Sequence, residues 1–384
     1  MGSRDELAGW LRLATAPGIG RATARRLLAA LGSPERVLGA DVDTLLALVG
    51  QDVVRILKRR DACDDAQVDA TERWLAGADA AVPRGLVVLG DARYPELLLR
   101  SADPPLLLFT LGRIDLLSAP GVAIVGSRSA TPQGMDNARA FGRFLSGRGL
   151  TIVSGLAMGI DGAAHEGGLA GPGSTVAFVG TGLDRVYPAR HAALARRIAE
   201  QGLVCSEYPL GADAKHRHFP QRNRLIAGVT LGTLVVEAAI ESGSLITARM
   251  ALECGREVFA MPGSIHSPQS RGCHRLIQEG AKLVETGDDV LRELRLEPGS
   301  GAARFQAPGT SLFAAADDAE AEAEAAGPDA ALIAALGHDP VTFDVLAART
   351  GLPSERLSAR LLELELSGQV QRLPGGLLQR RVAT

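Results

Sequence analysis

The sequence is poor in cysteine and lacks any long apolar run, and both absences narrow the class of protein. Its four cysteines, Cys63, Cys205, Cys254 and Cys273, are far apart and form no Cys-x-x-Cys pair. This spacing gives no zinc site and favours a reducing compartment. No apolar stretch reaches membrane-spanning length, and the polar amphipathic start of the chain is no signal peptide. We therefore expect a cytoplasmic protein without membrane contact, metal or other cofactor.

Excess charge is also absent. The net charge is −3, with 46% hydrophobic and 22% charged residues, so the chain as a whole carries no nucleic-acid signature and any anion site must be local. Nearly all basic residues are arginine, which suits phosphate binding, but a biased genome explains this equally well. The length of 384 residues allows about two to three domains with ample core.

The most informative stretch is 121–128, Gly-Val-Ala-Ile-Val-Gly-Ser-Arg. Its apolar run between glycines is typical of a strand buried on both faces, and helical spacing follows Pro132. A strand, a small-residue turn and a helix N-terminus together can hold a phosphate on free backbone N–H groups. We therefore predict an anion-binding turn at Gly126, Ser127 and Arg128. The alternative is a turn that needs glycine for its geometry alone.

Five further short apolar runs alternate with helical spacing, which predicts a mainly parallel, doubly wound sheet. The expected strands cover 151–154, 175–179, 203–205, 234–236 and 258–260. Ligands of such sheets bind beyond the carboxyl ends of the strands. The turns with Ser127, Arg128, Ser154, Gly155 and Gly182 should therefore share one edge. The turn at 126–131 lacks two glycines of the dinucleotide fingerprint, so a nicotinamide cofactor is not expected.

The chain divides into four parts. Residues 1–80 form a helical module whose Pro17-Gly18-Ile19-Gly20 turn is typical of a helix–hairpin–helix; Arg21, Arg25 and Arg26 favour contact with DNA phosphates, and a purely structural hairpin is the alternative. Residues 84–295 form the α/β domain, entered through short strands. Residues 296–328 are an acidic linker rich in Ala, Gly and Pro.

Residues 329–384 have the pattern of a winged helix, with helices at 330–336, 342–349 and 354–366 and a hairpin at 370–379. The third helix carries Glu355, Glu363 and Glu365 against Arg356 and Arg360. Because glutamates repel DNA phosphates, we interpret this part as an interaction or regulatory module rather than a reader of the major groove.

The densest polar cluster is 216–224, His-Arg-His-Phe-Pro-Gln-Arg-Asn-Arg, which we expect as a loop before a helix starting at Leu225. Arg222 and Arg224 at a helix N-terminus would oppose the helix dipole, and a bound phosphate would offset that conflict. Phe219 beside arginines matches single-stranded nucleic-acid sites, where a ring stacks on a base. The alternative is internal pairing of Arg222 or Arg224 with Glu207 or Glu237.

Catalysis is not indicated. Ser242 and Ser244 open a helix, and a serine nucleophile needs an activating base. His165 is the obvious candidate, but a lone helical histidine is more often structural. We therefore expect no catalytic residue.

Taken in order, these segments resemble the DNA-processing protein A (DprA/Smf) family. The resemblance covers roughly residues 86–290 and rests on 122–128, 152–165, 182–188, 206–209, 219–224, 234–238, 242–249 and 262–263. The terminal modules also resemble family members, though less specifically.

The resemblance implies an extended Rossmann-like domain that binds single-stranded DNA, forms a homodimer and loads a RecA-type recombinase in natural transformation, displacing or tolerating single-strand-binding protein. The family's pocket would fall on the 126–128 and Gly155 turns and on Phe219, Arg222, Asn223 and Arg224, with a basic contact near Arg190 and the dimer surface near Leu276 and Ile277. His191 and His274 stand where the family usually has Asn.

Two other functions stay open from the residues alone. A nucleotide monophosphate phosphoribohydrolase-type enzyme would hold one phosphate in the same pocket and use Glu237 or Asp161 as acid or base. A winged-helix transcription regulator would bind duplex DNA through 329–384, against which the acidic third helix argues.

Overall fold

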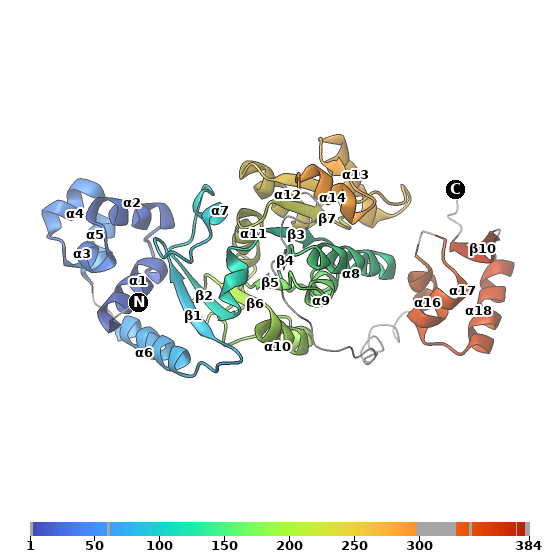
Figure 1. Cartoon of the computed structure of the whole chain (residues 1–384), viewed down its shortest axis with the longest axis horizontal. Helices are drawn as coiled ribbons and strands as arrows, with labels where there is room; N and C mark the ends of the chain where they lie inside the picture. Colours follow the sequence, from blue (N-terminus) through green and yellow to red (C-terminus); the bar gives the residue numbers. More distant parts are fainter. Residues whose placement is uncertain (1–2, 60–61, 297–327, 338–339, 374, 381–384) are drawn as a thin grey trace.

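The computed structural model describes residues 3–59, 62–296, 328–337, 340–373 and 375–380. A helical module stands at one end of the chain's long axis, a wound α/β domain lies in the middle, and a small helical domain with a hairpin stands at the other end (Figure 1). The predicted linker falls almost wholly on residues outside these ranges.

The N-terminal module consists of α1 (Arg4–Thr15), α2 (Arg21–Leu31), α3 (Pro34–Gly39), α4 (Val42–Leu48), α5 (Gln51–Lys58) and α6 (Ala62–Ala76). Side chains of Ser3, Ser33 and Asp41 cap three of these helices by accepting backbone N–H groups. The turn between α1 and α2 has Gly18 at φ +91°, a conformation that favours glycine.

The core of the module continues into the edge of the sheet. Its buried leucines and Trp10 belong to one cluster with Leu86, Leu107 and Phe109 from the first two strands of the sheet. The rings of Trp74 and Phe109 pack edge to face, with their centroids 6.1 Å apart. Because the two parts share one apolar cluster, the module is fixed against the edge of the sheet.

The central sheet has nine strands in the described part of the chain, in the order β1-β2-β6-β5-β4-β3-β7-β8-β9. They are β1 (Arg84–Val88), β2 (Leu107–Gly112), β3 (Gly121–Val125), β4 (Thr151–Ser154), β5 (Thr175–Phe178), β6 (Leu203–Ser206), β7 (Gly232–Val235), β8 (Glu257–Ala260) and β9 (Lys282–Leu283). The strands from β6 across to β9 are parallel, whereas β2 runs antiparallel to β6 and to β1. The predicted mainly parallel, doubly wound fold is confirmed.

Helices cover both faces of the sheet. They are α8 (Pro132–Gly147), α9 (Ile160–Leu169), α10 (Ala192–Gln201), α11 (His218–Gly228), α12 (Gly243–Glu253), α13 (Arg271–Gln278) and α14 (Gly287–Glu293), with the short α7 (Glu96–Leu99), η1 (Ile114–Leu117), η2 (Ala189–His191) and η3 (Pro268–Ser270) between strands. Along β3, Val122 and Ile124 face α8, α9 and α14, while Ala123 and Val125 face α11 to α13. This two-residue alternation makes the strand apolar throughout.

The winding reverses beside β3. The chain runs from β3 through β4 and β5 to β6 on one side, and β7 then returns to the other side of β3. At the carboxyl ends of these two neighbours, the Ser127 N–H donates to the Glu237 carbonyl at 2.8 Å. Ligands of doubly wound sheets bind at such a reversal.

The expectation of a loop at 216–224 is wrong from His218 onward, because α11 begins there. His218, Arg222 and Ile226 lie four residues apart and form a buried face. Pro220 sits in the first turn, where its missing N–H leaves no intrahelical bond unmade. Arg222 and Arg224 therefore lie beyond the first turn, and the predicted conflict with the helix dipole does not arise.

The C-terminal domain consists of α16 (Pro328–Leu336), α17 (Phe343–Thr350), α18 (Ser354–Leu366) and the hairpin β10 (Val370–Leu373) and β11 (Leu377–Arg380). Val341 adds a bridge to Leu378. The predicted winged helix is confirmed. Arg349 of this domain donates to the Gln133 side chain at 2.8 Å and pairs with Asp136 at 3.2 Å, both in α8.

Within the described ranges, no helix combines the length and the hydropathy that crossing a bilayer requires.

Truncation of Phe109 tests the shared core. Phe109→Ala should lower the free energy of unfolding by about 3–5 kcal/mol, because it leaves a cavity between β2 and the helical module. Both tryptophans of the chain, Trp10 and Trp74, lie in this module. Tryptophan fluorescence should therefore show an unfolding transition at a lower denaturant concentration than in the wild type. Phe343→Ala, in the winged helix, is the matched control and should leave that transition in place.

Candidate nucleic-acid interface

The turn after β3 is tightly packed. A side chain at Gly126 would meet Ile160 at 2.6 Å and the Glu237 carbonyl at 2.8 Å, so glycine is required here for close approach. The Ser127 N–H is bonded to that carbonyl, and its Oγ accepts the Ser129 N–H at 3.2 Å. Two N–H groups of the turn are therefore already satisfied, whereas Arg128 is exposed.

The turn after β4 is satisfied from within the chain as well. The Asp161 carboxylate accepts the N–H groups of Gly155 at 3.1 Å and Ala157 at 3.2 Å, and the Ser154 hydroxyl donates to the Ile124 carbonyl at 2.7 Å. Burial raises the pKa of Asp161, against the opposing charge of Arg222. An internal carboxylate thus occupies the two amides that a bound phosphate would otherwise use.

Arg222 lies beneath this turn rather than on the surface. It is 4% exposed, and its Nη1 donates to the Phe178 carbonyl at 2.6 Å. A side chain at Gly155 would collide with the guanidinium. Burial lowers the pKa of Arg222 to about 10, and its Nε has no partner among the described residues. Arg222 therefore supplies positive charge from below the edge.

Three side chains form an accessible column above the turns. The Arg128 guanidinium lies over the Phe219 ring at 5.3 Å, and the rings of Phe219 and Tyr187 are 5.5 Å apart at 37°. Tyr187 is 49% exposed, and no ion pair to Arg128 occurs in the described part of the chain. A cation over an aromatic face is the arrangement that binds a phosphate beside a stacked base. We call Arg128, Phe219 and Tyr187 the aromatic column.

Sequence reasoning did not select Tyr187. The signal was available, since Tyr187-Pro188 follows the Gly182 turn within one of the segments on which the resemblance rests. It was missed because Tyr187 reaches Phe219 from a different strand-to-helix connection, which the linear sequence does not show.

The remaining predicted contacts are Arg190, Gly182 and Asn223, which are not among the three residues of the column. Exposed Arg190 precedes His191, whose Nδ1 lies 3.0 Å from the Leu156 carbonyl in the Gly155 turn. The N–H of Gly182 is already bonded within the chain, because it donates to the Ala212 carbonyl at 3.0 Å. Asn223 is half-buried in α11.

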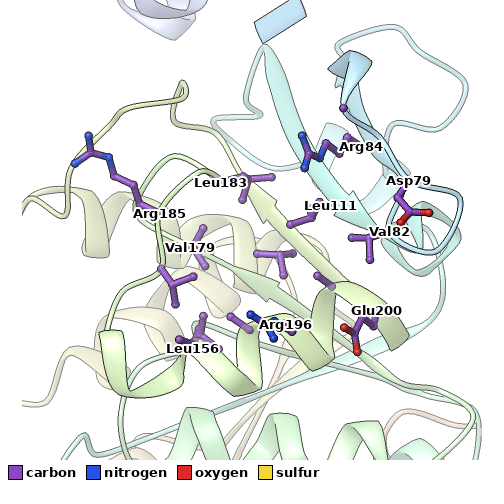
Figure 2. A pocket seen from close by; sticks show the side chains of 16 residues that line it. Asp79, Val82, Arg84, Leu111, Leu156, Val179, Leu183, Arg185, Arg196 and Glu200 are labelled. Atoms are coloured by element: carbon purple, nitrogen blue, oxygen red, sulfur yellow. The ribbon is translucent and has the colours of Figure 1, made fainter. Parts of the chain in front are cut away.

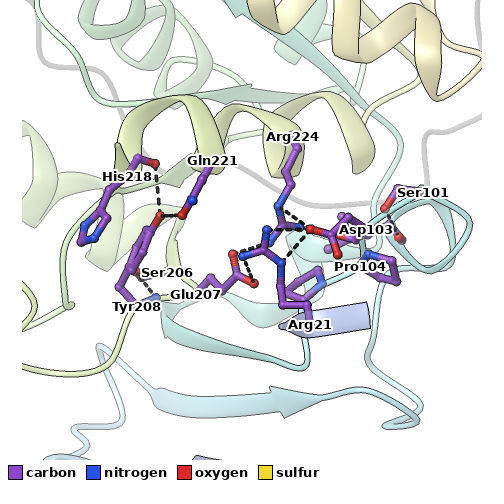
Figure 3. A network of polar contacts seen from close by, with 12 residues as sticks. Arg21, Ser101, Asp103, Pro104, Ser206, Glu207, Tyr208, His218, Gln221 and Arg224 are labelled. Atoms are coloured by element: carbon purple, nitrogen blue, oxygen red, sulfur yellow. Dashed lines mark hydrogen bonds and ion pairs between the residues drawn. The ribbon is translucent and has the colours of Figure 1, made fainter. Parts of the chain in front are cut away.

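Arg224 is paired internally. It pairs with Glu207 and donates to the Asp103 carbonyl, as Figure 3 shows. This is the internal pairing with Glu207 that the sequence left open. Glu237 instead accepts the N–H of Thr131, which caps α8, at 2.9 Å. Arg21 and Arg25 of the hairpin module also bond to Asp103, both at 2.7 Å.

His165 is structural. It is fully buried; its Nδ1 lies 2.7 Å from the Thr175 hydroxyl, and its Nε2 accepts the Leu156 N–H at 3.2 Å. The Thr175 hydroxyl donates to the Ile152 carbonyl, so the histidine must carry its proton on Nδ1. Burial lowers the pKa of His165 to about 3, with the charges of His191 and Arg222 adding to the effect.

A cavity of about 480 Å³ is lined in part by Leu156, the residue after Gly155 (Figure 2). Its wall is largely apolar, with Leu111, Leu156 and Val179, and the charged side chains Asp79, Arg84, Arg196 and Glu200 also line it. Leu156, at φ +61°, lies between the turn and this cavity. Among described residues, no three His, Cys, Asp or Glu side chains are grouped to hold a metal ion.

The predicted dimer surface lies on α13. Leu276 is 7% exposed and packs in the core under the sheet, and Ile277 is half-buried against the same cluster. A partner could touch Ile277 and the exposed residues around it more readily than Leu276.

Comparisons with known proteins agree with the fold. Residues 85–295 match the family model for DNA recombination-mediator protein A, 316–376 match the DprA winged helix domain, and 11–55 match a SAM-like helix-hairpin-helix tandem. The chain is 42% identical to Protein Smf of Escherichia coli over 295 residues, which is 76% of each chain. It is 51% identical to DNA processing protein DprA of Streptococcus pneumoniae over 203 residues, 53% of this chain and 72% of the relative.

Two solved structures are also similar. DprA from S. pneumoniae aligns with a TM-score of 0.59 at 38% identity, over 74% of this chain and 97% of that one. DprA from Helicobacter pylori, described for its single-stranded DNA binding mode, aligns with a TM-score of 0.50 at 30% identity, over 55% of this chain and 95% of that one.

The buried histidine makes a prediction about pH. The folded state holds His165 neutral down to about pH 3, whereas the unfolded chain takes up a proton near the ordinary value of 6.5. The stabilisation is complete above pH 6.5 and is lost on acidification, by about 1.4 kcal/mol for each pH unit. Between pH 7.5 and 5.0 this histidine should remove about 2 kcal/mol from the unfolding free energy measured in urea.

His165→Gln should flatten that dependence relative to the wild type, and His266→Gln, at an exposed histidine, should not. Equal slopes for wild type and His165→Gln would show that His165 is not held neutral by the fold.

Proposed function

The chain belongs to the DNA recombination-mediator protein A family, and from that premise we propose that it binds single-stranded DNA along the carboxyl edge of its sheet, without covalent chemistry. The aromatic column carries the proposal. The exposed guanidinium of Arg128 comes from the turn after β3, where the winding of the sheet reverses and where such folds bind ligands, and it meets the rings of Phe219 and Tyr187. The binding described for the H. pylori relative supports the same ligand.

Each part of the edge has a distinct task in this proposal. Arg128 contacts a phosphate, and Phe219 and Tyr187 offer faces on which bases stack without regard to sequence. The backbone turns can approach the strand closely because they consist of small residues, namely Gly126, Ser127, Ser154 and Gly155. Arg222 raises the potential of the edge from beneath, and Arg190 extends it on the exposed side. Contacts from Gly182, Asn223 and Arg224 remain predictions.

The role we propose in the cell is that of a recombination mediator. The protein would cover incoming or processed single strands, tolerate or displace single-strand-binding protein, and load a RecA-type recombinase on the strand. A homodimer joined near Ile277 on α13 would present two such edges to one strand. The family to which the chain belongs supports this role.

No observation favours the nucleotide enzyme over this proposal. Both carboxylates that could act as acid or base make structural bonds: Asp161 to the Gly155 turn and Glu237 to the cap of α8. Incubation with nucleoside monophosphates distinguishes the two functions, since release of free base would require the enzyme.

Removing the guanidinium or the ring of the column should weaken binding. Arg128→Ala and Phe219→Ala should each raise the Kd for a labelled single-stranded oligonucleotide by roughly ten- to a hundredfold, the range expected for a charged contact or a stacked base. Arg128→Ala should also reduce the slope of log K against log salt by about 0.7, the value for one phosphate on a single strand. Fluorescence anisotropy across a salt series measures both quantities.

Arg113→Ala is the matched control, because Arg113 pairs with Asp115 on the surface away from the column. It should leave both quantities unchanged. Wild-type affinity and slope in Arg128→Ala would refute the proposed edge.

Tyr187 tests the part of the column that the sequence did not reveal. Tyr187→Ala should weaken single-strand binding by roughly fivefold or more, since the base would lose one aromatic face. Tyr187→Phe should bind like the wild type, because stacking needs the ring and not the hydroxyl. If Tyr187→Phe weakens binding as much as Tyr187→Ala, the hydroxyl rather than the ring makes the contact.

A further inference from the structure

Five charged side chains meet between the helical module and the α/β domain. Arg21 and Arg25 come from α2, Asp103 from the loop before β2, Glu207 from the end of β6, and Arg224 from α11 (Figure 3). We call this set the Asp103 hub. Asp103 accepts from Arg21 and Arg25 at 2.7 Å each, and its carboxylate lies 3.6 Å from the Arg224 Nε. Arg21 also reaches Glu207 at 3.7 Å.

The hub is only partly withdrawn from water, since Arg21 and Asp103 are 31% and 34% exposed, and it is unbalanced in charge. Arg224 and Glu207 are each 13% exposed, and three guanidinium groups share two carboxylates. Burial alone would raise the pKa of Asp103, but the bonds from Arg21 and Arg25 and the charge of Arg224 outweigh it and hold that pKa below its usual range. Removal of the Asp103 carboxylate would leave Arg21 and Arg224 to share Glu207, and Arg25 with the Pro104 carbonyl alone. Three partly buried cations would then share one carboxylate, which weakens the hold on the elements that carry them.

Two consecutive residues, Glu207 and Tyr208, contact α11 at two points. Glu207 pairs with Arg224 in the second turn of α11. The next residue, Tyr208, stacks on His218 at 4.0 Å and contacts the Gln221 side chain at 3.1 Å, both near the start of α11. Figure 3 shows both attachments side by side. The 207–208 segment therefore fixes the first two turns of the helix that carries Phe219.

The hub also sets the rotation of α11 about its axis. Arg222 and Arg224 are two residues apart, so their side chains leave the helix about 200° from each other. Arg222 bonds to the Phe178 carbonyl under the sheet edge, and Arg224 bonds to the hub on the other side. A helix held on opposite sides cannot rotate without breaking one attachment, and its rotation determines where Phe219 points.

We propose that the Asp103 hub is a positioning element of the single-strand site, which couples the helical module through α11 to the placement of Phe219. This inference rests on the proposed function. It gives Arg21 and Arg25 a role different from the one that the hairpin motif suggests: they act through Asp103 and not on a DNA phosphate. In this proposal Arg224 acts by holding α11, and the contact to the strand that the sequence predicts for it plays no part.

Asp103→Asn tests the proposal, because two interpretations of the hub predict opposite changes in the affinity for single-stranded DNA. If the three arginines only supply charge, removing Asp103 releases cations and should tighten single-strand binding. If the hub positions Phe219, the same variant should weaken binding roughly five- to fiftyfold, the range that coupling energies within polar networks correspond to. Asp115→Asn, which removes a carboxylate from an exposed pair, is the matched control and should not weaken binding.

The route through Phe219 has its own readouts. In a Phe219→Ala background, Asp103→Asn should cause little further loss of affinity for single-stranded DNA. The slope of log K against log salt should stay at the wild-type value, because no phosphate contact is removed. Quenching of 2-aminopurine in the oligonucleotide, which reports stacking, should fall in Asp103→Asn. Glu207→Gln should reproduce these effects and replaces Asp103→Asn if that variant does not fold.

A DNA-free measurement separates this proposal from the proposed function. Amide hydrogen exchange in α11 of the full chain should be faster in Asp103→Asn than in Asp115→Asn. Unchanged exchange overturns the hub even if DNA binds as expected. Faster exchange in a protein that does not bind single strands refutes the proposed function and retains only the hold of the hub on α11. Tighter or unchanged DNA binding by Asp103→Asn, or full additivity with Phe219→Ala, also overturns the hub.

Discussion

Burial of β3 on both faces is the constraint on which the rest of the molecule depends. Val122 to Val125 can be buried only if helices cover both faces of the sheet, and this coverage requires the reversal of winding beside β3. The reversal brings the turns after β3, β4 and β7 to one edge, where their N–H groups need partners. Glu237 and Asp161 supply those partners from within the chain. The anion site that we propose at this edge therefore depends on side chains, with Arg128 exposed beside the turn after β3.

The sequence predicted the parts of the fold that hydrophobic period and turn residues determine. The parallel strands, the helix capped by Thr342 and the glycine turn of the helical module all follow from local patterns, because burial imposes those patterns directly. The start of α11 was not predicted. Its first turns are mainly polar and contain Pro220, so the helical period is hidden until Arg222 is recognised as a buried residue.

The arginines of the candidate site show the limit of such reasoning most clearly. Arg128, Arg222 and Arg224 are chemically equal in the sequence, yet the structure exposes the first, buries the second under a turn and pairs the third with Glu207. Their partners are distant in the chain, and a guanidinium gives no local sign of which carboxylate or carbonyl it will meet. Local motifs therefore indicated which arginines to consider, whereas showing where each guanidinium lies required the fold.

The close contact between Gly155 and Arg222 has a consequence for how sequences of this kind can diverge. Any side chain at position 155 occupies the space of the guanidinium, and Arg222 has only the Phe178 carbonyl as a bonded acceptor among the described residues. Displacing it would leave a buried guanidinium without this hydrogen bond, which is costly. A larger residue at 155 is tolerated only after 222 has become shorter, and a shorter residue at 222 first leaves a void under the turn. The two positions, far apart in the chain, form one unit of evolutionary change and should vary together across the family.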